Sequence, residues 1–86
     1  MQLVSLENGN LINAERVVAV ISPDSAPAKR MMQECKKRAA LIDATHGKKI
    51  QSVIITDNES VVLSFLPAEE LLKRFNHKGG DGDAEG

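Results

Sequence analysis

The chain has few residues of the kinds that stack bases or cross-link a fold. Its 86 residues include two phenylalanines and no tryptophan or tyrosine. Proteins that bind single-stranded nucleic acids usually stack bases on exposed aromatic rings, so the composition argues against that class. The single cysteine, Cys35, excludes an internal disulfide framework and is typical of a reducing, cytoplasmic compartment.

Long apolar runs are also absent. No run approaches the roughly 18 apolar residues that a membrane-spanning helix requires, so no contact with a membrane is expected. Residues 1–10 contain no basic residue and no long apolar core, and a secretory signal is therefore not expected. We expect one small domain of marginal stability, because a chain of this length buries only about two-thirds of the surface that its unfolded form exposes.

The charge that is present is unevenly distributed. The whole chain has a formal net charge of −1, whereas residues 16–49 contain eight basic and three acidic residues, a local net charge of +5. Charge that is segregated in this way usually faces a partner. The middle of the chain is therefore the first place to look for a binding surface.

Short apolar runs separated by polar turns predict an α+β fold. We expect a small, mostly antiparallel sheet of about five short strands, with one central amphipathic helix and a short C-terminal helix. The expected strands cover residues 1–6, 11–21, 41–43, 50–56 and 61–65. The central helix should begin within residues 22–27, with Ser25 or Ser22 as its cap, and end near residue 39 or 40. Residues 1–75 form the predicted single domain, and residues 76–86 form a disordered acidic, glycine-rich tail.

The strands also predict an oligomer. Residues 17–21, 53–55 and 61–63 are apolar without alternation, which is typical of strands that are buried on both faces. A last helix over residues 68–75, with Leu71, Leu72 and Phe75 facing inward, and the central helix can together cover only one face. We expect another copy of the chain to cover the remaining apolar surface.

Catalytic residues are scarce. Cys35 and His46 are the only plausible nucleophile–base pair, yet Cys35 lies on the apolar helix face, where a thiol is usually inert. Asp43 and His46 could form an acid–base couple, but hydrogen bonds from the backbone or from Thr45 to Asp43 are the simpler interpretation. One cysteine and two separated histidines give no metal-ligand spacing, and no cofactor is expected.

Three basic residues occupy positions that suit contact with a polyanion. The loop 45–49 lacks the P-loop pattern of two glycines, lysine and Ser/Thr, so nucleotide hydrolysis is not supported. Its adjacent Lys48 and Lys49 suit point-charge contacts with a polyanion backbone, although a solvated basic loop is the commoner explanation. Arg16 directly precedes a predicted buried strand, which would hold its guanidinium group rigidly.

Two segments resemble a known family. They are residues 22–30, SPDSAPAKR, and residues 41–49, LIDATHGKK. These segments are similar to those of the RemA-type family of bacterial extracellular matrix regulatory proteins, and the similarity extends over roughly residues 4–75. The resemblance implies a small α+β protein that binds double-stranded DNA, has no enzymatic activity and takes no small-molecule substrate. It also implies a ring-shaped homo-oligomer of heptamer or octamer type and control of matrix (biofilm) genes.

The resemblance also implies which residues contact DNA. Family members use basic residues on the exterior of the ring, and the matching positions here are Arg16, Lys48 and Lys49. The two lysines stand where the family usually has arginines, which removes bidentate phosphate geometry. Lys29 and Arg30 are secondary candidates, and they could instead hold the start of the helix against a carboxylate or a neighbouring subunit.

Two alternatives to DNA binding remain. The net charge of −1 and the acidic tail also fit an oligomeric protein-interaction scaffold that does not bind DNA. An enzyme that acts at the turn of Asp43 and His46 would need a concave pocket that converges there.

Overall fold

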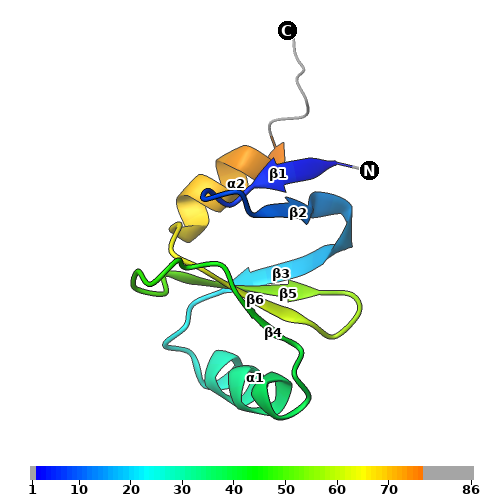
Figure 1. The fold of residues 1–86 in the computed structure, drawn as a ribbon, viewed down its shortest axis with the longest axis vertical. Helices are drawn as coiled ribbons and strands as arrows, with labels where there is room; N and C mark the ends of the chain where they lie inside the picture. The colour runs from blue at the N-terminus through cyan, green and yellow to red at the C-terminus, as the bar shows by residue number, and fades with distance from the viewer. Residues whose placement is uncertain (1, 77–86) are drawn as a thin grey trace, which may run out of the picture.

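The computed structural model describes residues 2–76 of the chain, and these residues form the predicted α+β fold (Figure 1). The elements in chain order are β1 (Leu3–Ser5), β2 (Leu11–Asn13), the 3-10 helix η1 (Ala14–Arg16), β3 (Val17–Ile21), α1 (Ala26–Lys37), β4 (Leu41–Asp43), β5 (Ser52–Thr56), β6 (Val61–Ser64) and α2 (Ala68–Asn76). Of the predicted tail, residues 77–86 lie outside the described residues. Within residues 2–76, no helix is long and apolar enough to cross a bilayer.

The strands form two sheets where the sequence predicts one. β1 and β2 form an antiparallel hairpin, and the second sheet has the strand order β3-β5-β6-β4. β5 pairs antiparallel with both β3 and β6, whereas β4 pairs with β6 in parallel. The difference arises in residues 11–21, whose apolar pattern predicts a single strand. There Asn13 accepts a hydrogen bond from the Glu15 N–H at 3.0 Å, and this cap starts η1 between β2 and β3.

The four-stranded sheet is the middle of three layers (Figure 1). α1 covers one face, and the β1–β2 hairpin and α2 lie over the other. Each face has its own core. Toward α1 the buried side chains are Ala28, Cys35, Val53, Val61 and Leu63, and toward α2 they are Leu6, Ala44, Ile54, Val62, Leu66 and Leu71. The β5–β6 hairpin, which the sequence predicts, therefore supplies buried residues to both faces and forms the centre of the domain.

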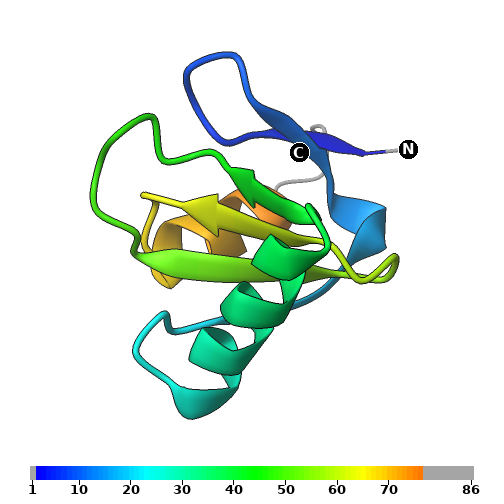
Figure 2. The ribbon, with the colours of Figure 1, turned by 60° about the horizontal axis from the view of Figure 1, so that its bottom comes forward.

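Ser25 caps α1, in agreement with the sequence. Its Oγ accepts a hydrogen bond from the Ala28 N–H at 3.3 Å, and Pro27 lies in the first turn, where its missing N–H costs no intrahelical bond. Ala28 and Cys35, two turns apart, are buried against the sheet that α1 crosses (Figure 2). The basic residues of α1 are consequently left exposed.

Two predictions about burial are wrong. Residues 17–21 are not buried on both faces, because β3 is an edge strand; none of its residues is fully buried, and Val18 is 66% exposed. In α2, Leu71 is buried but Leu72 is 61% exposed, since neighbouring helical residues point about 100° apart. An apolar run by itself does not distinguish a central strand from an edge strand.

Candidate nucleic-acid interface

Arg16 is held at the start of β3 by the turn that follows β5. Its Nε donates a hydrogen bond to Asp57 Oδ1 at 3.0 Å, and its carbonyl accepts one from the Asp57 N–H at 2.9 Å. The Arg16 side chain nevertheless remains 59% exposed. The two contacts restrict the direction of the guanidinium group while most of the side chain stays accessible.

The loop between β4 and β5 is closed by Asp43 and Thr45. Asp43 Oδ1 accepts hydrogen bonds from the Thr45 hydroxyl and, at 2.9 Å, from the Thr45 N–H. The side-chain hydrogen bond from Thr45, followed by the backbone one, holds the pKa of Asp43 below its ordinary value. His46 and Gly47 then adopt left-handed conformations, with φ of 54° and 81°. Asp43 thus accepts the turn hydrogen bonds that the sequence favours over an acid–base couple with His46.

This tight turn brings Lys48 and Lys49 to the surface. Lys48 donates its N–H to the Thr45 carbonyl at 3.0 Å, and its Nζ lies 4.7 Å from the centroid of the Phe65 ring, within range of a cation–π contact. Lys49 is exposed. Neither lysine forms an ion pair with any residue from 2 to 76, so both charges are available to an anionic partner.

The secondary candidates lie in the α1 layer, on the other face of the sheet from the β1–β2 hairpin. Lys29 and Arg30 are both exposed in α1. No carboxylate in the described part of the chain forms an ion pair with either side chain. Contact with a carboxylate within residues 2–76 therefore does not explain why basic residues occupy these two positions.

Arg16 and the two lysines occupy opposite ends of the four-stranded sheet. Arg16 contacts Asp57, which directly follows β5, whereas Lys48 and Lys49 lie in the loop that precedes β5. Figures 1 and 2 both show η1 and this loop at opposite ends of the sheet. A strand of this length spans about 13 Å. One subunit therefore does not gather the three cations, which can act on one partner only if that partner is longer than the strands.

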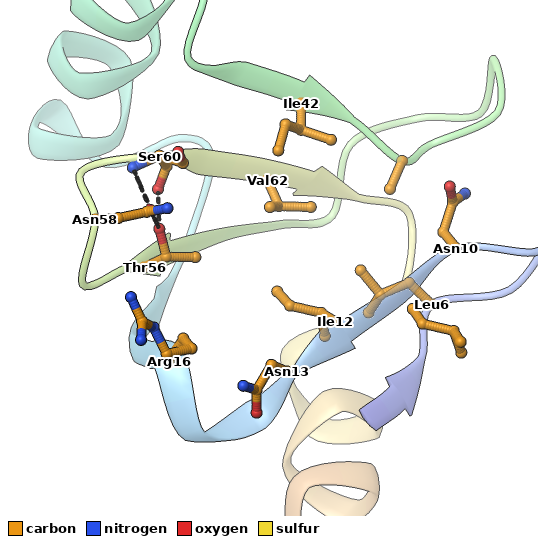
Figure 3. Close-up of a pocket in the computed structure, with 12 residues that line it drawn as sticks. Leu6, Asn10, Ile12, Asn13, Arg16, Ile42, Thr56, Asn58, Ser60 and Val62 are labelled. Carbon is orange, nitrogen blue, oxygen red and sulfur yellow. Dashed lines mark hydrogen bonds between the residues drawn. The ribbon is translucent and has the colours of Figure 1, made fainter. Parts of the chain in front are cut away.

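A groove opens beside Arg16, between the β1–β2 hairpin and the sheet, with a volume of about 250 Å³. Figure 3 shows polar side chains near Arg16 at one end and Ile12, Ile42 and Val62 along the rest. No histidine, cysteine, aspartate or glutamate lines the groove, so it contains no general acid or base. Among residues 2–76, no three His, Cys, Asp or Glu side chains gather to hold a metal ion.

Sequence reasoning misses two residues that position the predicted cations, Asp57 and Phe65. Asp57 is 41 residues from Arg16 along the chain, and Phe65 follows β6 while Lys48 precedes β5. An aspartate in a polar turn and a phenylalanine after an apolar strand both have ordinary local explanations. No local signal therefore connects either residue with its cation.

Comparison with known proteins identifies a family. A family model described as RemA-like, "Extracellular matrix regulatory protein A-like", matches residues 3–75. The chain is 40% identical over 85 residues to a protein of Alkaliphilus metalliredigens. The aligned region covers 99% of this chain and 91% of that relative. It is 46% identical over 83 residues to a protein of Thermodesulfovibrio yellowstonii. That aligned region covers 94% of this chain and 98% of the relative. Both relatives have the name "Putative regulatory protein".

Proposed function

This chain belongs to the RemA-like family, and we propose that it is a non-enzymatic transcriptional regulator that binds the backbone of double-stranded DNA as a ring-shaped homo-oligomer. A regulatory role agrees with the names of its relatives. Control of matrix genes is part of the same proposal. The proposed phosphate contacts are Arg16, Lys48 and Lys49, with Lys29 and Arg30 as secondary contacts.

The observation that carries the proposal is the combination of restraint and exposure at Arg16. Asp57 directs the guanidinium group through a hydrogen bond of 3.0 Å, yet 59% of the side chain is exposed. A side chain that is already restricted loses less conformational freedom when it contacts a partner than a freely rotating one does. Lys48 is restricted in a weaker way by the Phe65 ring. Both ends of the sheet thus offer cations that are prepared for an anionic partner.

The spacing of these cations favours contact with the DNA backbone. β5 spans about 13 Å and the cations lie beyond its two ends, so their separation is at least the width of about 12 Å of the major groove. Arg16 and the two lysines can therefore contact phosphates of both strands. Lysines act as point charges and distinguish no base, and α1 packs along the sheet through Ala28 and Cys35. We expect binding with little direct readout of base sequence.

A ring would combine contacts that are individually weak. Each phosphate contact adds to the salt dependence of binding, so three cations on a single subunit would hold DNA feebly at moderate salt. Several subunits on one duplex act at a high effective concentration, and their weak contacts reinforce one another. Apolar side chains that remain exposed on β3 and β4 support the oligomer that this proposal requires.

An oligomeric protein-interaction scaffold that does not bind DNA is the second candidate function. The observation in its favour is that Asp57 offsets the charge of Arg16. The net charge of −1 agrees with this alternative, because a neutral or acidic assembly attracts DNA weakly. Both candidates share the oligomer and differ only in whether the exposed cations contact DNA.

Fluorescence anisotropy with a short DNA duplex at several salt concentrations separates the two candidates. We expect the affinity of the full chain to fall steeply with salt. Lys48→Ala/Lys49→Ala should weaken binding and lower the slope of log affinity against log salt by about 0.9 for each lost phosphate contact.

The matched control is Lys36→Ala/Lys37→Ala, which removes the same charge from an exposed part of α1 and should leave the slope close to that of the wild type. An equal loss of slope in both variants would reject Lys48 and Lys49 as the contacts. No binding by the wild-type protein at low salt would reject the DNA function in favour of the scaffold.

A further inference from the structure

The groove beside Arg16 is apolar along most of its length and polar at one end. Its most deeply buried lining residues are Leu6, Ala44 and Val62, and Leu11 and Ile42 line it as exposed residues. Figure 3 shows the polar end, which consists of Arg16, Thr56, Asn58 and Ser60. A concave apolar surface with a few polar groups gathered at one end is the usual form of a small-molecule site.

Hydrogen bonds fix the orientation of two amide groups that line the groove. Asn58 Oδ1 accepts a hydrogen bond from the Ser60 N–H at 3.2 Å, and Asn13 Oδ1 accepts one from the Glu15 N–H at 3.0 Å. A backbone N–H can only donate, so the oxygen of each amide must face it and the NH2 group must point elsewhere. Neither NH2 group donates a hydrogen bond to any residue from 2 to 76.

Arg16 adds further donors to the polar end without adding net charge. Asp57 accepts a hydrogen bond from Nε alone, so the two NH2 groups of the guanidinium have no acceptor among residues 2–76. The Asp57 carboxylate offsets the positive charge of Arg16. No other charged side chain within the described residues lines the groove. The polar end therefore presents several N–H donors and almost no net charge.

These properties define the chemistry of a ligand that would fit. A carbonyl oxygen is an uncharged acceptor and matches donors that have no net charge around them. A carboxylate would lose its hydration with no net positive charge to compensate, and an ammonium group would bring donors to a place that already has them. The volume of about 250 Å³ lies below the 300–1,000 Å³ that is usual for drug-sized ligands, so the occupant is small.

We propose that the groove binds a small neutral molecule with an apolar chain or ring and a carbonyl head, such as an amide or a lactone. The carbonyl oxygen accepts hydrogen bonds from Asn58 and Arg16, and the apolar part covers Ile42 and Val62. One consequence rests on the proposed function: the ligand occupies donors of Arg16 that are proposed to hold a phosphate. Ligand and DNA should therefore weaken each other's binding by the same factor.

NMR titration of the full chain with N,N-dimethylhexanamide tests the site without DNA. This probe has a carbonyl acceptor, a five-carbon chain and no N–H donor. We expect saturable changes in the Asn58 NH2 resonances and in the methyl resonances of Ile42 and Val62, with a dissociation constant on the order of 1 mM. Hexanoate and hexylammonium, which have chains of similar length, should bind at least about fivefold more weakly.

Two outcomes of this titration would overturn the proposal. Unchanged Asn58 and methyl resonances would show that the groove does not take the probe. Tighter binding of hexanoate than of the amide would show that the polar end selects an anion, and tighter binding of hexylammonium would reject the donor-rich end in the same way.

Asn58→Asp tests the proposed donor directly. The carboxylate can still accept the hydrogen bond from the Ser60 N–H, so the turn should be retained, while an acceptor replaces the NH2 group. We expect the affinity for the probe, followed by the methyl resonances of Val62, to fall about tenfold or more. Asn8→Asp is the matched control and should bind the probe like the wild type, because Asn8 is exposed and does not line the groove.

An unchanged affinity in Asn58→Asp would reject the assigned contact with the carbonyl head. If this variant does not fold, Ile42→Ser provides a second test at an exposed position of the apolar part. It shortens the wall that the chain covers and should weaken the probe by about two- to fivefold. Binding as tight as that of the wild type would show that the chain does not lie there.

Fluorescence anisotropy with a DNA duplex separates this site from the proposed function. At ten times the dissociation constant of the probe, competition for Arg16 should lower the apparent affinity for the duplex by up to about tenfold. If the probe binds but the wild type binds no DNA at low salt, the ligand site stands and the DNA function is rejected. If DNA binds and the probe does not, the DNA function stands and the site is rejected. If both bind without affecting each other, the shared use of Arg16 is wrong.

Discussion

The two ends of the four-stranded sheet present their cations differently. At the η1 end, Arg16 is joined to Asp57 by a side-chain and a backbone hydrogen bond, and the two charges offset each other. At the loop end, Lys48 lies against the Phe65 ring, and Lys49 has no acidic partner among residues 2–76. One end therefore has an oriented cation with little net charge, and the other has more net charge with less restraint.

Net charge and orientation contribute to the binding of a polyanion in different ways. Net charge acts over about 8–10 Å at physiological ionic strength and accelerates association. Orientation acts at contact, where a guanidinium group can hold a phosphate through two parallel hydrogen bonds. Under the proposed function, the lysine end would mainly attract DNA and the arginine end would mainly retain it.

Arg16→Ala should cause the greatest loss of binding. The substitution removes the oriented cation and leaves the Asp57 carboxylate unpaired, so repulsion replaces an attractive contact. We expect the affinity for duplex DNA to fall on the order of 10- to 100-fold at constant salt, the equivalent of one hydrogen bond between charged groups. Surface plasmon resonance should assign most of this loss to faster dissociation.

The backbone hydrogen bond from the Asp57 N–H to the carbonyl of residue 16 does not depend on the arginine side chain, so the fold should be retained. Lys48→Ala/Lys49→Ala provides the comparison, because its loss should appear mainly in the association rate. If both variants change the same rate constant, the division of roles between the two ends is wrong.

Asp57→Asn should have a smaller effect of opposite sign. The amide oxygen can still accept the hydrogen bond from Arg16 Nε, while the negative charge that offsets the cation disappears. We expect DNA affinity to rise by up to about fivefold, since exposed ion pairs are worth at most about 1 kcal/mol. Glu69→Gln, an exposed acid on α2, is the matched control and should change affinity less. Weaker binding by Asp57→Asn would show that the charge of Asp57 is needed to hold Arg16.

Thr45→Val tests the restraint of the loop end and should affect binding least. It removes the hydroxyl that donates to Asp43, so the pKa of the Asp43 carboxyl should rise toward its ordinary value. Because the folded-state pKa is lowered, these hydrogen bonds stabilise the fold above the ordinary pKa of about 3.9. That contribution is lost as the pH falls through the lowered value. Titration of the Asp43 carboxyl by NMR measures the change; an unaltered pKa would assign the lowering to the Thr45 N–H alone.

The fold is predictable from the sequence where its signals are local. A polar turn between two apolar runs predicts the β5–β6 hairpin, and Ser25 before an amphipathic run predicts the start of α1. The prediction of a single strand over residues 11–21 is wrong, because the Asn13 cap interrupts an apolar pattern that otherwise favours one strand. The edge position of β3 depends on pairs such as Ile21 with Val53, and residues so far apart leave no joint pattern in the sequence.

The candidate site likewise has some features that follow from local sequence and others that only the folded chain determines. The amino acids alone account for the positions of the positive charges, for the turn around Asp43 and Thr45 and, through two short segments, for the resemblance to the family. The folded chain adds that Arg16 lies at the other end of the sheet from Lys48, that Asp57 and Phe65 contact these cations, and that both edge strands keep exposed apolar side chains. Charge and turn preference belong to single residues and their neighbours, whereas strand order and burial depend on contacts between segments far apart in the chain.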